Sequence, residues 1–343
     1  MKNRVARLIE IGKIDIVIED IPRLGEGEVL VKMKAVGICG SDMHYFLEGG
    51  LGSFKQKLPM YIGHEPSGEV VETNGALEFK PGDRVAVEPG RACLYCRWCL
   101  KGKHNLCENG VFMGANGSGA FADYVVVHKT QLAKIPKTMS YELGALMEPI
   151  GVAMHAVNLV NPPHTISAAI VGSGPIGLSI LAVLRKMGIN QIFMIDKIPY
   201  RVSFAKKMGA TKSFLFEESV QGMKKATEGK GVSVVFDTGG TQDSVNLCID
   251  IVGMSGTIAL VGIPTEDFLT YNPHKLRTKE VRLQNVRRSN QTLHDGIELF
   301  KSKTTIEKIV THTFPFEKIQ KAFELVGGYN DNVIKCMITN FVE

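Results

Sequence analysis

The chain has 343 residues, of which 44% are hydrophobic and 22% charged, and a formal net charge of +5. That length favours about two domains, and that composition is typical of a globular protein and excludes disorder over the bulk of the chain. Because the 40 basic and 35 acidic residues are mixed along the sequence, a slightly basic solvated surface is favoured over a nucleic-acid footprint. We predict neither a membrane span nor a signal peptide, and therefore a cytoplasmic protein.

The first half of the chain is typical of short strands joined by glycine-rich turns. Strands are predicted at 29–36, 68–71 and 84–87. The turn signature Lys80-Pro-Gly-Asp83 separates the last two of these strands. This pattern predicts a β-rich lobe with long functional loops.

From about residue 167 the pattern changes to an alternation of strands and helices. Such alternation, with apolar strands, predicts a doubly wound parallel sheet covered by helices on both faces. After Val286 the alternation stops, and helices near 292–302 and 316–326 and a strand near 332–339 remain. The predicted strands of the sheet are 168–171, 191–195, 213–216, 233–236, 257–261 and 281–286. One predicted helix follows the first strand and ends near 187, and the others span 201–208, 219–227 and 242–251.

A dinucleotide-binding loop is predicted where the first of these strands meets its helix, at Gly172-Ser-Gly-Pro-Ile-Gly177. Gly172 permits the tight turn, Gly174 lets the backbone approach a pyrophosphate, and Gly177 allows close helix–strand packing. The N-terminus of the helix offers free N–H groups to the phosphates. Asp196 ends the next strand, and we expect it to bind the adenosine ribose hydroxyls and to repel a 2′-phosphate. The loop therefore predicts NAD over NADP, while Lys197 leaves dual use open.

The seven cysteines are odd in number, and four of them lie in one short loop. In a cytoplasmic chain this clustering favours metal over disulfides. Four thiolates suit a closed, tetrahedral structural zinc site. A zinc ribbon that binds nucleic acid is the alternative, and no partner domain supports it. The four ligands are Cys93, Cys96, Cys99 and Cys107.

A second candidate metal site is dispersed. Gly37-Ile-Cys-Gly-Ser-Asp42 carries Cys39, Gly63-His-Glu65 carries His64 and Glu65, and Glu148 precedes Pro149. A thiolate, an imidazole and a carboxylate together make a zinc site with an open fourth position. Spacing alone does not show that these side chains converge, and each has an ordinary structural reading.

Taken in order over essentially the whole chain, these motifs resemble the zinc-dependent medium-chain dehydrogenases, and specifically their polyol (sorbitol-like) branch. The resemblance implies a β-rich, GroES-like catalytic lobe at 1–152, a Rossmann NAD-binding domain at 153–286, and a return segment at 287–343 that completes the first lobe. It also implies an active site in the cleft between the lobes and two zinc ions per chain, one catalytic and one structural. Relatives are commonly homodimers or homotetramers.

The resemblance assigns roles residue by residue. Cys39, His64 and Glu65 match the catalytic zinc ligands, and Glu148 matches a second glutamate that contacts the zinc-bound water or replaces it. Ser41 and His44 match a proton relay. Tyr45, Phe112 and Arg288 match substrate contacts. The implied cofactor contacts are Gly172, Gly174, Pro175, Ile176, Gly177, Asp196, Arg201, Val261, Gly262, Ile263, Val286, Arg287 and Arg288.

The function implied is transfer of a hydride from a secondary hydroxyl of a polyol to NAD, which gives a ketose. Glu148 stands where simple alcohol dehydrogenases usually have a cysteine, and Cys39-Gly-Ser-Asp42 differs from the threonine dehydrogenase pattern. An L-threonine or 2,3-butanediol dehydrogenase stays open, as does a non-catalytic NAD-binding protein. One departure is that the family's Arg-Tyr pair is Arg288-Ser289 here, which predicts an altered substrate pocket.

Overall fold

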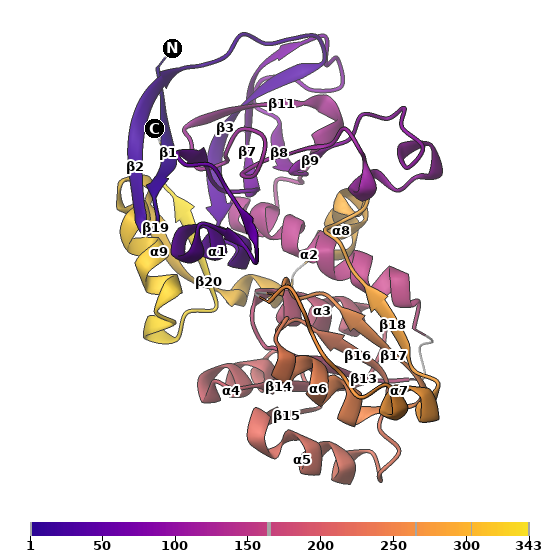
Figure 1. Cartoon of the computed structure of the whole chain (residues 1–343). Helices are drawn as coiled ribbons and strands as arrows, with labels where there is room; N and C mark the ends of the chain where they lie inside the picture. The colour runs from indigo at the N-terminus through magenta and orange to yellow at the C-terminus, as the bar shows by residue number, and fades with distance from the viewer. Residues whose placement is uncertain (1, 163–165, 265, 303, 342–343) are drawn as a thin grey trace. The chain divides into compact units, whose positions relative to one another are not determined.

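The computed structural model describes residues 2–162, 166–264, 266–302 and 304–341 (Figure 1). The chain divides into two compact units. The first unit is Met1–Gly151 together with Ser289–Glu343, and the second is Val152–Arg288. The first unit is thus discontinuous in sequence. The predicted fold class, a β-rich lobe plus a doubly wound parallel sheet, is confirmed.

The first unit is organised around a sheet with the strand order β12-β8-β7-β3-β20-β19. The long strand β3 pairs with β7 along one edge, and its other edge is shared by β11 and β20. The chain therefore returns from the second unit to add β20 directly beside β3 (Figure 1). The strands are β3 (Glu28–Gly37), β7 (Glu65–Asn74), β8 (Arg84–Val87), β11 (Tyr124–His128), β12 (Leu132–Lys134), β19 (Val310–Pro315) and β20 (Lys335–Thr339).

Smaller sheets and bridges complete the strands of this unit. The hairpin of β1 and β2 is extended by β6, and two further two-stranded pairs form. Strand β1 contributes Val5, Ala6 and Leu8 to the core, and β2 adds Ile14. These strands are β1 (Lys2–Glu10), β2 (Lys13–Asp20), β4 (Gly50–Leu51), β5 (Phe54–Lys55), β6 (Met60–Tyr61), β9 (Gly90–Arg91) and β10 (Val111–Phe112).

The core of the first unit joins residues from both of its chain segments. Phe323, on a helix of the return segment, packs against Phe46 and Phe121 with ring centroids 5.3 and 5.7 Å apart. All three rings are buried. The return segment is therefore part of the core and not a peripheral addition. The helices of this unit are α1 (Gly40–Glu48), α8 (Leu293–Phe300) and α9 (Ile319–Gly327).

The longest helix, α2 (Tyr141–Val160), runs across the boundary between the two units in sequence. Among the described residues it is the only helix that is long and apolar enough to cross a membrane. However, 78% of its most apolar 18-residue stretch is buried inside the protein. Ala145, Leu146 and Met147 are fully buried. Such burial is typical of the core helix of a globular protein.

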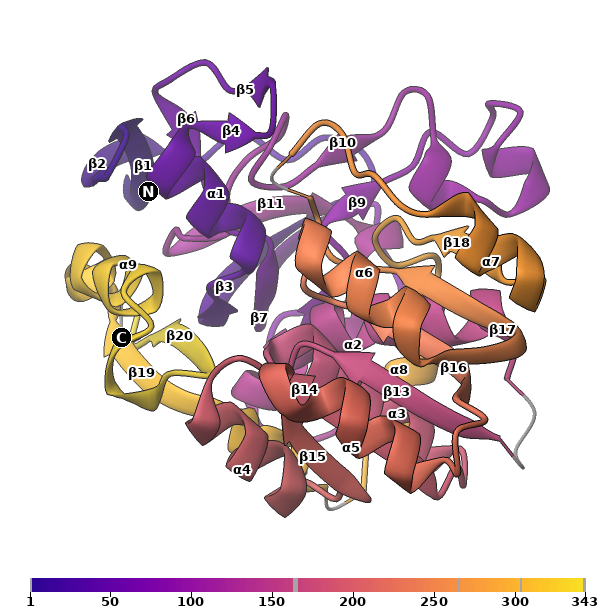
Figure 2. The same cartoon turned by 60° about the horizontal axis from the view of Figure 1, so that its bottom comes forward.

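The second unit is a parallel sheet with the strand order β15-β14-β13-β16-β17-β18. Right-handed crossovers place α3 and α4 on one face and α5 and α6 on the other, and α5 lies next to α6 (Figure 2). The strands are β13 (Ser167–Val171), β14 (Gln191–Asp196), β15 (Lys212–Leu215), β16 (Val232–Asp237), β17 (Val252–Leu260) and β18 (Arg282–Asn285), and the helices are α3 (Pro175–Lys186), α4 (Pro199–Lys207), α5 (Ser219–Ala226), α6 (Gln242–Ile251) and α7 (Pro273–Lys279).

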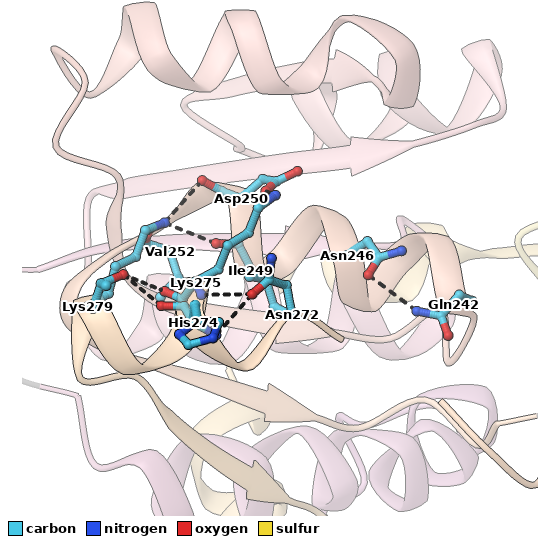
Figure 3. Close-up of polar contacts among 10 residues, drawn as sticks. Gln242, Asn246, Ile249, Asp250, Val252, Asn272, His274, Lys275 and Lys279 are labelled. Carbon is cyan, nitrogen blue, oxygen red and sulfur yellow. Dashed lines mark hydrogen bonds and ion pairs between the residues drawn. The ribbon is translucent and has the colours of Figure 1, made fainter. Parts of the chain in front are cut away.

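Lysine side chains of α7 hold the end of α6 (Figure 3). Lys279 Nζ donates to the carbonyl oxygens of Ile249 and Val252 at 3.0 and 2.8 Å, and Lys275 pairs with Asp250 at 2.6 Å. A cation at a helix C-terminus satisfies carbonyls that the helix leaves unpaired. These contacts fix the turn from α6 into β17.

Candidate active site

The first predicted ligand lies where β3 leads into α1. Cys39 is the N-cap residue of α1, and the Asp42 carboxylate accepts a hydrogen bond from its backbone N–H at 3.0 Å. Asp42 is completely buried. This arrangement fixes the backbone at Cys39, because an acidic side chain in the first turn stabilises a helix start.

Asp42 also orients the second predicted ligand. Its Oδ1 accepts the N–H of Gly63 at 3.1 Å and lies 3.4 Å from His64 Nδ1. The other ring nitrogen, Nε2, faces Ser41 Oγ at 3.4 Å. A carboxylate behind a histidine sets the tautomer that leaves the opposite nitrogen available to a metal. The sequence motifs did not predict this role for Asp42.

The structure brings together Cys39, His64 and Glu65, whose ligand atoms all lie within 4.8 Å of one another. Thiolate, imidazole and carboxylate are the donors that zinc prefers. The donor set therefore fits a zinc ion held by three protein ligands with one position open. Their identity as the ligands stays a prediction.

Charges around this group favour a bound cation. Burial alone would lower the pKa of His64, but the charges of Asp42 and Cys39 raise it well above its ordinary value. Burial likewise opposes the charged form of Lys335, and the charges of Glu65 and Cys39 raise its pKa. The acidic groups therefore favour positive charge at this place, and a metal ion would be favoured in the same way.

Glu148 lies on α2 and is not part of the 4.8 Å group. It is buried, and burial, followed by the charges of Glu65 and Glu88, raises its pKa to about 8 against the opposing charge of His64. The charges of His64 and Glu65 thus act on this carboxyl group in opposite directions. The predicted role, contact with a zinc-bound water or its replacement, stays a prediction.

The predicted relay pair lies on one face of α1. Ser41 and His44 are three residues apart, and His44 Nδ1 lies 3.2 Å from Glu48 Oε1 near the surface. Ser41 thus lies at the candidate ligands and His44 toward solvent. This direction is the one that a proton path requires.

The predicted substrate contacts are placed differently from one another. The Phe112 ring lies 5.5 Å from the His64 ring, centroid to centroid, so Phe112 forms an apolar wall of the site. Tyr45 is buried in the core of the first unit. Arg288 ends the second unit with a left-handed backbone (φ 56°). Ser289, which stands where the family has tyrosine, donates to the Glu88 carboxylate at 2.9 Å.

The four cysteines of the loop form a second group. The Sγ–Sγ distances are 3.9 Å for Cys93–Cys99, 3.6 Å for Cys96–Cys99 and 4.0 Å for Cys96–Cys107. Sulfurs that share one tetrahedral zinc ion at about 2.3 Å lie about 3.8 Å from one another. The thiols are therefore already arranged as a closed zinc site.

The electrostatics of this loop also fit a cation. Burial opposes ionisation of Cys93, but the backbone N–H groups of Tyr95 and Cys96 lower its pKa to about 6. Burial raises the pKa of Cys99 to about 12. Because four thiolates this close repel one another, a divalent cation is needed to ionise all of them.

The return segment fastens the cysteine loop. Asn290 Oδ1 accepts the N–H of His104 at 2.9 Å, and the amide groups of Asn290 and Gln291 donate to the Gly102 carbonyl at 3.0 Å. The loop is thereby tied to the segment that begins the C-terminal part of the first unit.

The glycine loop of the second unit has the geometry of a phosphate cradle. A Cβ at Gly177 would lie 1.9 Å from the Gly172 carbonyl oxygen, so Gly177 is required by helix–loop packing. Gly172 has a φ of 101°, which favours glycine. Gly174 differs, because its backbone is extended in a conformation that any residue adopts. A Cβ at this position would meet only the Arg201 guanidinium, at 3.5 Å. The space above Gly174 therefore fits a bound group rather than the protein itself.

Asp196 lies directly beside this loop. Its Oδ2 accepts the N–H of Ser173 at 2.6 Å, and its Oδ1 accepts that of Ile198 at 2.9 Å. Each oxygen keeps a second lone pair. The carboxylate is thus anchored at the loop and still able to accept from a ribose hydroxyl.

The remaining predicted cofactor contacts lie at the carboxyl ends of the strands. The backbone N–H groups of Val261 and Gly262 donate to the Asp237 carbonyl at 2.8 and 2.9 Å, and that of Val286 donates to Leu260 at 2.9 Å. In open parallel sheets this edge is where nucleotides bind. Pro175 and Ile176 begin α3, Ile263 is exposed, and Arg287 follows β18.

Comparison with known proteins agrees with both halves of this description. The model of the alcohol dehydrogenase GroES-like domain matches residues 25–137, and that of zinc-binding dehydrogenases matches residues 175–302. A sorbitol dehydrogenase of Bacillus subtilis is 34% identical over 93% of this chain and 92% of that protein. An L-threonine 3-dehydrogenase of Caldanaerobacter subterraneus is also 34% identical, over 91% and 92%. A crystal structure of an Escherichia coli oxidoreductase of unknown specificity superposes with a TM-score of 0.93 at 33% identity, over 99% of both chains.

A β-rich lobe with two zinc-type donor sets and a sheet with a dinucleotide loop define a nicotinamide-dependent oxidoreductase. On these matches the chain belongs to the zinc-dependent medium-chain dehydrogenases, in their polyol branch. The substrate and the oligomeric state stay predictions.

Proposed function

We propose that the protein is a polyol dehydrogenase that oxidises a secondary hydroxyl of a sugar alcohol to a ketone with NAD as hydride acceptor. The observation that carries the proposal is the convergence of Cys39, His64 and Glu65. The similarity to a sorbitol dehydrogenase supports the substrate class. Thiols arranged for metal rather than paired as disulfides support a reducing compartment such as the cytoplasm.

The chemistry divides between the two units. When bound, zinc would polarise the substrate hydroxyl as a Lewis acid, and the nicotinamide would accept the hydride. His64, held by Asp42, presents Nε2 in a fixed direction. Ser41 lies next to that nitrogen and accepts the proton of the substrate hydroxyl. The proton then moves in the direction of His44 and Glu48, which are nearer to solvent. Phe112 keeps one side of the site apolar, which limits the access of water.

Cofactor choice is expected to depend on the charge of Asp196. The wild-type protein is predicted to bind NADH at least about 100-fold more tightly than NADPH, because a like charge facing the 2′-phosphate costs several kcal/mol. Asp196→Asn keeps the size of the side chain and one side-chain oxygen that accepts a backbone N–H. It is expected to narrow the preference for NADH over NADPH by about tenfold or more. Fluorescence titration with both dinucleotides measures it.

The matched control is Asp250→Asn, which removes an acid of the same unit that pairs with Lys275. It should leave the preference unchanged. Tighter binding of NADPH than of NADH by the wild-type protein would refute the assignment of Asp196.

A substrate panel tests the proposed function itself. Sugar alcohols, inositols, 2,3-butanediol and L-threonine are supplied with NAD, and NADH absorbance is followed. We expect the highest kcat/KM with a sugar alcohol, at least about tenfold above threonine and butanediol, a margin worth about 1.4 kcal/mol in the transition state. A preference for threonine would favour the second candidate function, which the threonine dehydrogenase relative supports.

Zinc content separates these enzymes from a non-catalytic dinucleotide-binding protein. An enzyme should contain two zinc ions per chain by elemental analysis, one for each donor group. A chain with one zinc ion and no turnover on any member of the panel would contradict the proposal.

A further inference from the structure

Lys335 is the only lysine that is buried among the residues that the structure describes. It begins β20, and its Nζ donates to Glu65 Oε1 at 2.8 Å, to Glu65 Oε2 at 2.5 Å and to the carbonyl oxygen of Ile38 at 3.0 Å. An ammonium group has three protons to donate, and here each has an acceptor. The charge is therefore fully satisfied without water.

The sheet brings these groups together from distant parts of the chain. Gly37 is the last residue of β3 and pairs with Glu65 of β7 on one side and with Met337 of β20 on the other. A Cβ at Gly37 would lie only 2.0 Å from Glu65 Oε2. The absence of a side chain at Gly37 thus lets the carboxylate reach across β3 to the ammonium group.

Lys335 contacts one predicted ligand and the backbone next to another. It binds the carboxylate of Glu65 directly and the carbonyl of Ile38, the residue before Cys39. Both oxygens of Glu65 are engaged, so a metal ion that binds Glu65 shares an oxygen with the ammonium group. Of the three ligands, Glu65 is the one whose negative charge already has a buried positive partner.

We propose that Lys335 is a positioning residue of the metal site that makes Glu65 a releasable ligand. The proposal rests on the proposed zinc site of Cys39, His64 and Glu65. With Lys335 present, departure of the metal leaves a paired Glu65. Without Lys335, departure of the metal leaves Glu65 as a buried carboxylate with no counter-charge, a state that is strongly disfavoured. Lys335 therefore stabilises the metal-free site relative to the zinc-bound site.

The test starts from the zinc-loaded full-length protein. Lys335→Met replaces the ammonium group by an apolar chain of similar length. Zinc loss to an excess of a chromophoric chelator is followed by absorbance, and the slow loss from the four-cysteine loop serves as an internal reference. The phase that His64→Ala abolishes is the phase of the Cys39 site. We expect Lys335→Met to slow that phase by about tenfold or more.

The outcomes are distinct. A faster or unchanged phase in Lys335→Met overturns the inference, since a lysine that merely supports the ligands would weaken the site when it is removed. Lys321→Met, at an exposed position of α9, must leave both phases unchanged. Wild-type protein with zinc only in the cysteine loop would refute the proposed zinc site, and this inference with it.

Two further variants cover a failure of Lys335→Met to fold. Lys335→Arg keeps the charge and the ability to bind both carboxylate oxygens. Its rate of zinc loss from the Cys39 site must therefore stay within about threefold of the wild-type rate. In the Glu65→Gln background there is no carboxylate to leave unpaired, so adding Lys335→Met must slow zinc loss less than it does in the wild type. Equal slowing in both backgrounds would show that Lys335 does not act through Glu65, and would overturn the inference.

Discussion

His64→Ala and Cys39→Ala will each lower kcat/KM for polyol oxidation by about 1,000-fold or more. Each change removes one of three donors to an ion that supplies several kcal/mol of charge stabilisation in the transition state, and each 1.36 kcal/mol corresponds to a factor of ten in rate. His64 also contacts Phe112 and Asp42, so in His64→Ala the Asp42 carboxylate loses one of its three partners and keeps the N–H groups of Cys39 and Gly63. Binding of NADH should be unchanged, because the dinucleotide loop belongs to the other unit. Initial rates and NADH titration measure the two quantities.

The histidine control is His294→Ala, at an exposed position of α8. It should leave both the rate and NADH binding unaltered. Activity of His64→Ala within tenfold of wild type, combined with loss of one zinc ion, would exclude the metal-assisted mechanism. Loss of NADH binding in His64→Ala would instead indicate a folding defect.

Cys96→Ser will chiefly lower stability. Structural zinc contributes about 10 kcal/mol to the folding of small zinc peptides. We expect a smaller loss here, at least about 3 kcal/mol in the free energy of unfolding, because Asn290 and Gln291 still hold part of the loop. Denaturant unfolding followed by circular dichroism, together with zinc analysis, measures it. The chemical step, measured on the folded fraction, should change little.

The effect of a chelator shows whether loss of zinc causes the lower stability of Cys96→Ser. A strong chelator should lower the Tm of the wild type but have a much smaller effect on Cys96→Ser, which has already lost its structural zinc. Cys248→Ser provides the cysteine control: this thiol is buried in the core of the second unit, so its change costs stability while the protein stays zinc-loaded and chelator-sensitive. Intact stability in Cys96→Ser with an altered chemical step would refute a structural role for the loop.

The dinucleotide loop and the strands of the second unit were predictable because each carries a local signal. Glycines spaced for a phosphate turn, apolar runs of strand length and an acid at a strand end all lie within about 30 residues. Helix α6 spans Gln242–Ile251, as its periodicity predicts. The start of β17 was not predicted, because Gly253, Ser255 and Gly256 interrupt the apolar run and Ser255 has a φ of 54°.

Other elements carry no such signal. Helix α2 is apolar on nearly every side, so the 3.6-residue period that marks an amphipathic helix is missing, and Pro149 lies inside it. The convergence of Cys39, His64 and Glu65 depends on long-range pairing of β3 with β7, which spacing does not encode. Two clues were present and unused: an acid three residues after Cys39, and a single lysine within the apolar run Ile334-Lys-Cys-Met-Ile338. They correspond to Asp42 and Lys335.

The pairing of β20 with β3 has a consequence for biosynthesis. During translation the thiol and carboxylate of the candidate centre leave the ribosome early, while their cationic counterpart is added about 270 residues later, after the entire nucleotide-binding unit. Until then the Glu65 carboxylate lacks the neighbour that neutralises it, and the edge of β3 next to Gly37 is uncovered. Completion of the metal pocket is therefore a late event in maturation, and a truncated chain that ends before β20 would have an intact nucleotide fold but an unfinished catalytic lobe.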